Sequence, residues 1–429
     1  MSWKRRYFCF ILRTNMLLRK RNNRYRCFVI IIVIVLVNLV FIFPPALLLH
    51  TPLVSSNGTL ISQTQSNMVD KGNHSLITSL PHAEVRHIVF LKVHKAAGTT
   101  VMNIIMRFAI SRNLSIMLPR TGNMFSQYNQ LISRKALPSF HEDKRMFDVF
   151  CNHVIFNKEI MAPFFPIDTV YIGIVRQPFD QFVSAFVYYR NLYQVKYLVK
   201  IPGDNPIKTY LSDPVLYEAK KLPHSFTNNR MAFDFGYPGV DFNNMTKFRE
   251  FLQKLDKDIN FVMVVELFDE SLILMMKLLK WHIKDIIYIK RNSFKKSHNL
   301  TFSLSEKIIH RRWAKLDYAL YNHFKTILIT KIKSAGPKFI HEVRNFRTIR
   351  TKVETFCKQY YGSGMLMIEE SEFHSPFFVR REDCKFLKLN AFDIINIARQ
   401  KHTARLDELG ITYCPQNKTT AECRKYPHL

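Results

Sequence analysis

Acidic residues are scarce in this 429-residue chain, and several familiar catalytic motifs are missing from it. The chain has 33 Asp and Glu against 63 Lys and Arg, a net charge of +30, so we expect anionic partners: nucleic acid, acidic glycans, nucleotides or lipid headgroups. There is no G-x-x-x-x-G-K-[ST] loop, which disfavours an NTPase that hydrolyses triphosphates. There is also no H-E-x-x-H or C-x-x-C ligand set, so we predict that no metal is required.

The sequence shows no internal repeat, and its composition changes only once, near residue 85. With 47% hydrophobic and 13% aromatic residues the chain can bury a large core, which excludes a disordered protein. Residues 50–85 are rich in Ser, Thr, Asn and Gln without an apolar period, so they predict a flexible stem. We therefore expect one folded domain over residues 86–429.

No acidic residue precedes Cys27, whereas nine basic residues do. The apolar segment 27–49, with Asn38 as its one strongly polar residue, is long enough to cross a bilayer. It lacks a convincing cleavage site, so it predicts an uncleaved signal anchor. The basic flank places residues 1–26 in the cytosol and everything after about residue 50 in the lumen or outside the cell.

Sequons and cysteines on the proposed lumenal side agree with this topology. Six Asn-x-Ser/Thr tripeptides fall there, at Asn57, Asn73, Asn113, Asn244, Asn299 and Asn417. Five cysteines would meet an oxidising compartment, so one of them stays unpaired or bridges to another chain. They are Cys151, Cys357, Cys384, Cys414 and Cys423. Cys414 and Cys423 close a short loop and are the favoured pair, although the sequence leaves the connectivity open.

Apolar runs followed by amphipathic stretches predict an α/β fold, with a central parallel sheet flanked by helices. The helices are indicated by apolar residues at helical spacing. After about residue 335 the pattern weakens. The expected strands are 87–93, 146–156, 169–175 and 260–268, and the expected helices are 100–110, 179–191, 269–281 and 306–328.

The first strand runs into the sequence HKAAGTT, which predicts an anion-binding loop at a helix N-terminus. Lys95 supplies a cation, Gly98 lets the backbone approach a ligand, and Thr99 and Thr100 offer hydroxyl groups. The alternative is an ordinary strand-helix turn with a threonine cap.

Arg176 ends a later apolar strand, and Ser184 follows eight residues on, in the next helix. Both can converge on one phosphate, the arginine through two hydrogen bonds and the serine through one. Two anion sites on neighbouring strands suit a nucleotide with phosphates at both ends. The alternative for Arg176 is a salt bridge to Asp180 or another acid.

Four ordered motifs carry a resemblance to a known family. They are LKVHKAAGTT, VRQPFDQFVSAFVYY, NNRMAFDFGY at 228–237 and ELFDESL at 266–272. Over roughly residues 86–325 the chain is similar to the galactose-3-O-sulfotransferase family of Golgi carbohydrate sulfotransferases, which includes galactosylceramide sulfotransferase. The chain departs from the family pattern at Val93, Thr99, Gln177 and Val183. The resemblance implies a P-loop-like sulfotransferase fold for residues 86–429 and a single-pass type II protein of the Golgi membrane.

The resemblance also implies the chemistry: transfer of a sulfuryl group from 3′-phosphoadenosine-5′-phosphosulfate (PAPS) to the 3-hydroxyl of a terminal β-galactose. The acceptor, a glycolipid or a glycoprotein glycan, stays open, as does a homodimer. The resemblance places the 5′-phosphosulfate on Lys95, Ala96, Ala97, Gly98, Thr99 and Thr100, and the 3′-phosphate on Arg176 and Ser184.

A general base and a cation are needed for this transfer. Lys95 is the candidate cation. His94, beside it, is the first candidate base because a near-neutral pKa suits proton abstraction, and His153 in CNHVIFN is the second. Lys92 either adds positive potential or points to solvent. Asn229 and Asp234 are weaker candidates for orienting the acceptor or the loop.

Two other functions fit the same topology. A Golgi glycosyltransferase often carries Asp-x-Asp at the end of a strand, but Asp256-Lys257-Asp258 precedes an apolar run, so we interpret it as a solvated turn. A glycan-binding protein without catalysis would use the basic surface, yet it gives no reason for Lys95, Arg176 and Ser184 to occur together. Nucleic acid is disfavoured because the predicted anchor keeps the domain away from it.

Overall fold

The computed structural model describes residues 83–122, 124–221, 224–290, 300–359 and 364–414, which belong to one compact unit, Thr78–Leu429. The predicted cytosolic tail, the anchor and almost all of the stem lie outside these residues. Among the residues described, no helix combines the length and the apolar character needed to span a bilayer. Val85 is already buried in the core, and its N–H donates to the carbonyl of Leu279.

The central sheet has four parallel strands in the order β2-β1-β3-β4. They are β1 (Ile88–Phe90), β2 (Val149–Phe150), β3 (Val170–Val175) and β4 (Phe261–Val264), and every residue in them is buried. Such strands are apolar throughout because helices cover both faces of a parallel sheet. The prediction of an α/β fold with a central parallel sheet is confirmed.

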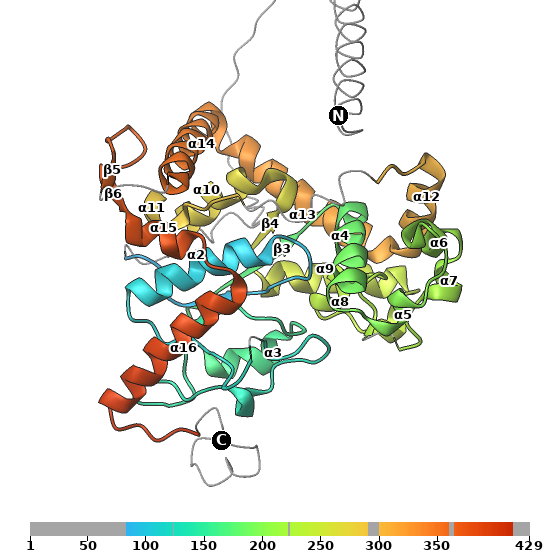
Figure 1. The fold of residues 1–429 in the computed structure, drawn as a ribbon, viewed down its shortest axis with the longest axis horizontal. Coiled ribbons are helices and arrows are strands. Elements are labelled where there is room, and N and C mark those ends of the chain that lie inside the picture. The colour runs from blue at the N-terminus through green and yellow to red at the C-terminus, as the bar shows by residue number, and fades with distance from the viewer. Residues whose placement is uncertain (1–82, 123, 222–223, 291–299, 360–363, 415–429) are drawn as a thin grey trace, which may run out of the picture. The chain divides into compact units, whose positions relative to one another are not determined.

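Each of three strands leads into a helix, as the apolar patterns predicted (Figure 1). α2 (Gly98–Ser111) follows β1, α4 (Pro178–Asn191) follows β3, and α10 (Phe268–Leu279) follows β4. Since the strands are parallel, their carboxyl ends meet at one edge of the sheet, which brings the segments after β1 and β3 together.

The remaining elements complete the covering layers. α13 (Lys315–Ser334) packs on β3 and β4, and α16 (Ala391–Glu408) crosses beside α2 (Figure 1). The others are α3 (Lys158–Met161), α5 (Lys196–Val199), α6 (Pro206–Ser212), α7 (Pro214–Tyr217), α8 (Arg230–Asp234), α9 (Met245–Asp258), α11 (Ile283–Ile286), α12 (Leu304–Trp313), α14 (Gly336–Lys358), α15 (Arg381–Leu387), β5 (Met365–Ile368) and β6 (Phe377–Arg380).

The strand expected over 146–156 is much shorter in the structure, where only Val149 and Phe150 pair with β1. Beyond them the backbone bonds to other segments. The carbonyl of His153 accepts from Ser126 N, and Phe156 N donates to the carbonyl of Asp234. The apolar run therefore continues into an irregular, largely buried segment after Phe150.

The single helix expected over 306–328 is also wrong, because the chain breaks at Ala314 between α12 and α13. Asn229 Oδ1 accepts from the N–H groups of Leu316 and Asp317, at 2.9 and 3.2 Å. In return the Asp317 carboxylate accepts from Ala232 N at 2.8 Å, near the start of α8. Two helix N-termini thus cap each other, and this exchange stops α12 from running on into α13.

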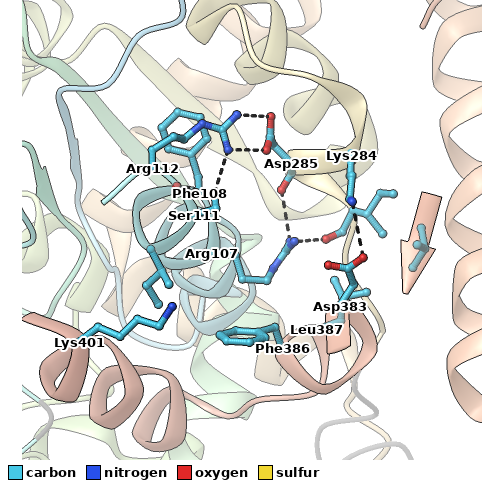
Figure 2. Close-up of a pocket in the computed structure, with 13 residues that line it drawn as sticks. Arg107, Phe108, Ser111, Arg112, Lys284, Asp285, Asp383, Phe386, Leu387 and Lys401 are labelled. Atoms are coloured by element: carbon cyan, nitrogen blue, oxygen red, sulfur yellow. Dashed lines mark hydrogen bonds and ion pairs between the residues drawn. The ribbon is translucent and has the colours of Figure 1, made fainter. Parts of the chain in front are cut away.

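A pocket of about 390 Å³ lies at the C-terminal end of α2, about 20 Å from its start by helical rise (Figure 2). Three of its four cations have partners, and the fourth is Lys401 of α16. Arg107 donates to the carbonyl of Ile287, Arg112 pairs with Asp285, and Lys284 lies 3.5 Å from an Asp383 oxygen. These contacts anchor α2 to α11 and α11 to α15, so we interpret this part of the pocket's polar wall as structural.

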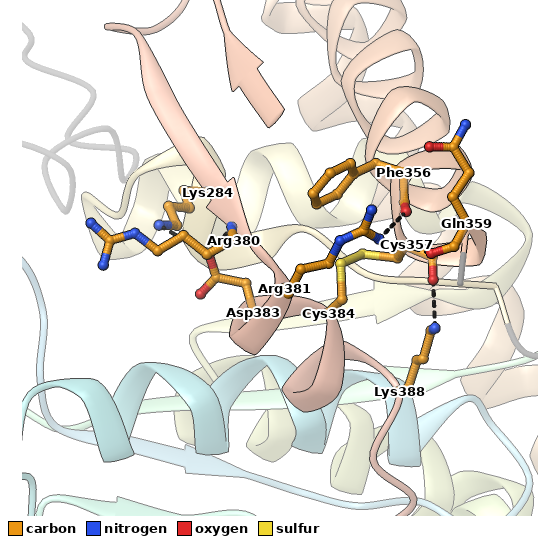
Figure 3. Close-up of a disulfide and its surroundings, with 9 residues drawn as sticks. All are labelled: Lys284, Phe356, Cys357, Gln359, Arg380, Arg381, Asp383, Cys384 and Lys388. Carbon is orange, nitrogen blue, oxygen red and sulfur yellow. Dashed lines mark hydrogen bonds and ion pairs between the residues drawn. A yellow bond between two sulfur atoms is a disulfide. The ribbon is translucent and has the colours of Figure 1, made fainter. Parts of the chain in front are cut away.

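A disulfide between Cys357 and Cys384 joins the end of α14 to α15 (Figure 3). Among the described cysteines, Cys151 is free and buried. Cys414 is disulfide-bonded. Its predicted partner, Cys423, lies outside the described residues, so the Cys414–Cys423 pair stays a prediction.

A second hydrophobic cluster, separate from the core around the sheet, forms on α4 with α5 and α6. Its buried members include Phe182, Phe186, Tyr189, Tyr210 and Phe226. α4 thus begins at the sheet edge and carries its aromatic face away from the sheet into this helical part. The loop after β1 lies against the start of α4, as the contacts described next show.

Candidate functional site

The loop between β1 and α2 adopts a strained backbone conformation. Lys95 and Ala97 have φ angles of 58° and 55°, in the left-handed region that residues with a Cβ avoid. Each such residue costs about 1–2 kcal/mol. The neighbours of the loop must therefore impose this conformation, as they often do where a backbone is shaped for binding.

Three side chains from three elements impose it. Gln181 of α4 donates from Nε2 to the His94 carbonyl at 3.0 Å, and Arg176 at the end of β3 donates to the Lys95 carbonyl at 3.1 Å. The carboxylate of Asp234, in α8, accepts from the His94 N–H at 2.8 Å. Two consecutive carbonyls and one N–H of the loop are thus fixed by polar side chains.

Lys95 and Arg176, which the sequence analysis assigned to two anion sites on neighbouring strands, lie next to each other. Besides the hydrogen bond to the Lys95 carbonyl, the arginine lowers the pKa of the lysine, which falls to about 8 through burial first and the Arg176 charge second. The Lys95 Nζ lies 3.5 Å from the centre of the Tyr188 ring on α4. Two adjacent, partly desolvated cations favour the approach of an anion. In the described part of the chain no ion pair within 4 Å joins Arg176 to Asp180 or to another acid. Burial lowers the pKa of Arg176, and the smaller effects of the Asp180 and Glu266 charges both raise it.

The other residues predicted to contact the nucleotide lie in the loop before α2, on α2 and on α4. Ala97 lies at the N-cap of α2 without a side-chain cap, so the alternative of a threonine cap is wrong. Thr99 is exposed and Thr100 half-buried at the start of α2, while Ser184 is half-buried on α4. Ala96 is fully buried. The first turn of α2 also has backbone N–H groups that find no acceptor within the helix itself, as at the start of any helix.

Gly98 has a packing role that the sequence analysis did not predict. A Cβ on Gly98 would lie 2.9 Å from Cγ of Lys92 and 3.3 Å from the Val93 carbonyl. The glycine is therefore needed for the close packing of α2 on the end of β1, whatever it contributes to a ligand.

Lys92 does not point to solvent. It is 5% exposed, and its Nζ lies 3.3 Å from the Met102 sulfur. Burial lowers its pKa to about 8, against an opposing effect of the nearby Cys151 thiol. Its ammonium group thus lies beneath α2, inside the core.

His94 is buried, with 3% exposure, and its ring nitrogen Nδ1 lies 2.8 Å from Asp234 Oδ2. Arg230 NH2 is also 3.2 Å from this nitrogen, and both carboxylate and guanidinium cannot be its partner in one tautomer. The shorter contact to the acceptor-only carboxylate places the hydrogen on Nδ1. Burial first, and then Arg230, lowers the His94 pKa to about 4, so the ring is neutral.

His153 stacks on His94, with ring centroids 4.2 Å apart. It is half-buried, whereas His94 is buried. Burial first, and then the His94 and Lys92 charges, holds the His153 pKa well below its ordinary value. Within the described residues, His94 Nε2 and His153 Nδ1 are buried nitrogens without a hydrogen-bond partner. The pair thus consists of two neutral rings, each with one buried nitrogen that has no hydrogen-bond partner in the described part of the chain.

Several residues of the site escaped the sequence analysis or were given too little weight. Arg230 binds Asp234 through NH2 at 2.9 Å and is 1% exposed. Gln181 was not singled out. The signal for Arg230 was available, since it lies four residues before Asp234 within NNRMAFDFGY. Nothing local marks Gln181 as a partner of the loop.

The Asp256-Lys257-Asp258 triplet lies in the last turn of α9, so the predicted turn is wrong. The helix continues to Asp258 because the Asn244 side chain caps its start and Lys254 pairs with Asp258 at 2.6 Å. Asp256 is exposed and lies 2.8 Å from His323 Nε2. Among the described residues, no group of three or more His, Cys, Asp or Glu side chains could hold a metal ion.

The comparisons with known proteins address the identity of this site. The sequence model of the galactose-3-O-sulfotransferase family matches residues 15–373. The chain belongs to the galactose-3-O-sulfotransferase family. It is therefore a sulfotransferase, and the match extends beyond the region over which the motifs alone showed a resemblance.

Individual relatives agree with this assignment. Human galactose-3-O-sulfotransferase 2 is 30% identical over 283 residues, which cover 65% of this chain and 70% of the relative. The mouse protein of the same name is 29% identical over 284 residues, covering 64% and 70%. Human galactosylceramide sulfotransferase is 28% identical over 276 residues, covering 63% of this chain and 64% of the relative.

Proposed function

We propose that this sulfotransferase transfers a sulfuryl group from PAPS to the 3-hydroxyl of a terminal β-galactose. The observation that carries the proposal is the convergence of Lys95 and Arg176, from two different strands, at one edge of a parallel sheet. Ligands of open α/β sheets bind at this edge. The names of the relatives support galactose as the acceptor sugar.

The residues present fit the donor. Lys95, Arg176 and the start of α2 offer two cations and backbone N–H groups, which suit a phosphosulfate. When bound, PAPS supplies the sulfuryl group. We assign the 5′ end to Lys95 through Thr100 and the 3′-phosphate to Arg176 and Ser184. The Lys95 ammonium stabilises the charge that develops on the bridging oxygen, which is the usual task of a preorganised cation.

A histidine of the stacked pair removes the proton from the acceptor hydroxyl. His94 was the first candidate from the sequence, but its ring is buried and its Nδ1–H is committed to Asp234. His153 is the more exposed of the two residues, although its Nδ1 is buried, and no carboxylate of the described residues holds its ring. The geometry therefore favours His153 as the base and His94 as its support. Both rings are neutral at physiological pH, as a base must be.

The proposal includes both a glycolipid and a glycoprotein glycan as acceptors. The predicted anchor at 27–49 would keep the domain at the lumenal face of the Golgi membrane as a type II protein. Asn113 and Asn244 are exposed, as glycosylated asparagines must be.

The test uses the full-length chain and two measurements. The product nucleotide, 3′-phosphoadenosine-5′-phosphate (PAP), should raise the melting temperature, because a ligand that binds only the folded state stabilises it. Labelled PAPS with a panel of β-galactosides should then give a 3-sulfated product. If PAP gives no shift and no galactoside is sulfated, the proposal fails.

Substitutions that mimic one ring nitrogen assign the base. An Asn side chain places a donor near Nδ1 of the histidine that it replaces. His153→Ala should remove most of kcat while PAP still binds. His94→Asn, which keeps the bond to Asp234, should retain much more activity. The reverse order would make His94 the base.

A further inference from the structure

Among the described residues, Asp234 is the one carboxylate that contacts the loop between β1 and α2. Its contacts go beyond a simple ion pair. It is 1% exposed, and its side chain accepts from both the backbone N–H and the ring Nδ1 of His94. Its backbone carbonyl accepts from Phe156 N at 3.0 Å. One residue therefore holds the loop after β1 by its side chain and the segment after His153 by its backbone.

Arg230 fixes this carboxylate in turn. Its Nε lies 3.0 Å from Asp234 Oδ1, and its other groups donate to the carbonyls of Ser225 and Gln127. Because Arg230 is 1% exposed and bound on three sides, the carboxylate cannot rotate away from His94. Gly236 lets this segment come close, since a Cβ there would lie 2.3 Å from the Phe156 carbonyl.

The loop needs this support from Asp234 because the left-handed backbone conformation of two of its residues is unfavourable on its own. His94 immediately precedes Lys95, whose φ of 58° sets the direction in which the ammonium group leaves the loop. Fixing the N–H and the ring of His94 fixes the residue on which that turn is built.

We propose that Asp234, held by Arg230, is a positioning residue of the donor site: through His94 it holds the turn that aims Lys95 at the phosphosulfate. This inference rests on the proposed function, because it assigns the loop to donor binding. The inference also explains three residues of the NNRMAFDFGY motif. Asn229 caps α13, Arg230 binds Asp234, and Gly236 leaves room for the backbone of Phe156.

The test compares two isosteric substitutions on buried carboxylates that meet at α8. In Asp234→Asn one acceptor becomes a donor facing His94. The matched control is Asp317→Asn: Asp317 is 2% exposed and accepts from the backbone of α8, but it does not contact the loop. The affinity for PAP is measured by calorimetry on the folded fraction of each full-length variant, together with KM for PAPS and kcat.

We expect Asp234→Asn to weaken PAP binding and raise KM for PAPS at least tenfold, and Asp317→Asn to change them less than twofold. A merely structural Asp234 would lower the melting temperature of the variant without changing the affinity of the molecules that remain folded. Equal PAP affinity in Asp234→Asn and the unsubstituted chain would overturn the inference.

A second pair of variants covers the case in which Asp234→Asn does not fold. His94→Asn keeps a donor for Asp234, while His94→Ala removes it, so PAP affinity should fall at least fivefold further in His94→Ala. Equal affinities in this pair would overturn the inference as well. If the unsubstituted chain itself does not bind PAP, the proposed function fails, and that outcome is distinct from the failure of Asp234 alone.

Discussion

Lys95 gives the sharpest prediction, because its pKa of about 8 lies within the working range of an assay. Only the protonated lysine can attract the phosphosulfate or neutralise the leaving oxygen. The value of kcat/KM, which reports on the free enzyme, should therefore fall on the alkaline side with an apparent pKa near 8. Burial and the neighbouring Arg176 cause the low value, so the loss belongs to this pair of cations.

The magnitude follows from the titration of one group. With a pKa of about 8, about one tenth of Lys95 is protonated at pH 9, so kcat/KM should be about tenfold below its plateau there. Binding of the donor anion favours the charged lysine, so the alkaline limb of kcat should lie at higher pH than that of kcat/KM. On the acid side we expect no limb near 6.5, because burial lowers the pKa of both His94 and His153.

The assay measures initial rates of sulfate transfer from labelled PAPS between pH 5.5 and 10. Lys95→Met should reduce kcat/KM by about 10²- to 10³-fold, as the loss of a preorganised charge does elsewhere. Lys95→Arg should be less active than the unsubstituted chain, because guanidinium geometry differs from that of ammonium, but it should lose the alkaline limb.

Lys92 is the matched control, because burial lowers its pKa to about 8 as well while its ammonium lies under α2 against Met102. Lys92→Met should keep the alkaline limb at the same pH. If the limb survives in Lys95→Arg and disappears in Lys92→Met, the reasoning about the loop is refuted.

Three further predictions concern stability. Asn229→Ala leaves two buried N–H groups of α13 without their acceptor, so unfolding in urea should show a loss of about 2–4 kcal/mol. The exposed cap Ser303→Ala should cost only about 1 kcal/mol, and equal losses would contradict the mutual capping of α8 and α13. Cys357→Ser with Cys384→Ser opens a loop with a sequence separation of 27, which should cost about 3–4 kcal/mol in thermal unfolding, whereas an unchanged melting temperature would show that the bond does not form. The third prediction concerns pH. The folded-state pKa of His94, about 4, lies below the unfolded value of about 6.5. The contribution of His94 to the free energy of unfolding is therefore present above pH 6.5 and lost as the pH falls to about 4. Relative to His94→Asn, the unsubstituted chain should lose about 3 kcal/mol over this range, and parallel stability curves would contradict it. Taking the difference between the two chains cancels the opposite contribution of Asp317, whose pKa burial raises to about 7.

The sequence was sufficient for the features that depend on local patterns. The four strands, the helices after β1, β3 and β4, and the loop that carries Lys95 are each encoded within about twenty residues. Arg176 was predictable for the same reason, since it directly follows an apolar strand. The parallel arrangement then brought it to Lys95, as the carboxyl ends of neighbouring strands require.

The features that the sequence did not reveal depend on contacts between distant segments. Asn229 and Asp317 break the expected helix over 306–328, but they are 88 residues apart and only the folded chain brings them together. The burial of His94 and Lys92 also could not be predicted, because the local sequence around a polar residue after a strand does not show whether that residue is buried. His94 is covered by Tyr189 and Phe226, which belong to a different hydrophobic cluster from the sheet.

The wide separation of the motifs in this family also has a physical reason in the loop itself. A loop with two left-handed residues cannot hold its own shape, so its hydrogen-bonding groups must be satisfied by side chains from elsewhere. Here Gln181 and Arg176 come from the second motif and Asp234 from the third, and each bonds to a different atom of His94 or Lys95. A substitution in any one motif should therefore act on the same turn. Their effects on PAP affinity should then be less than additive, because the first substitution already releases the turn that the second one would disturb.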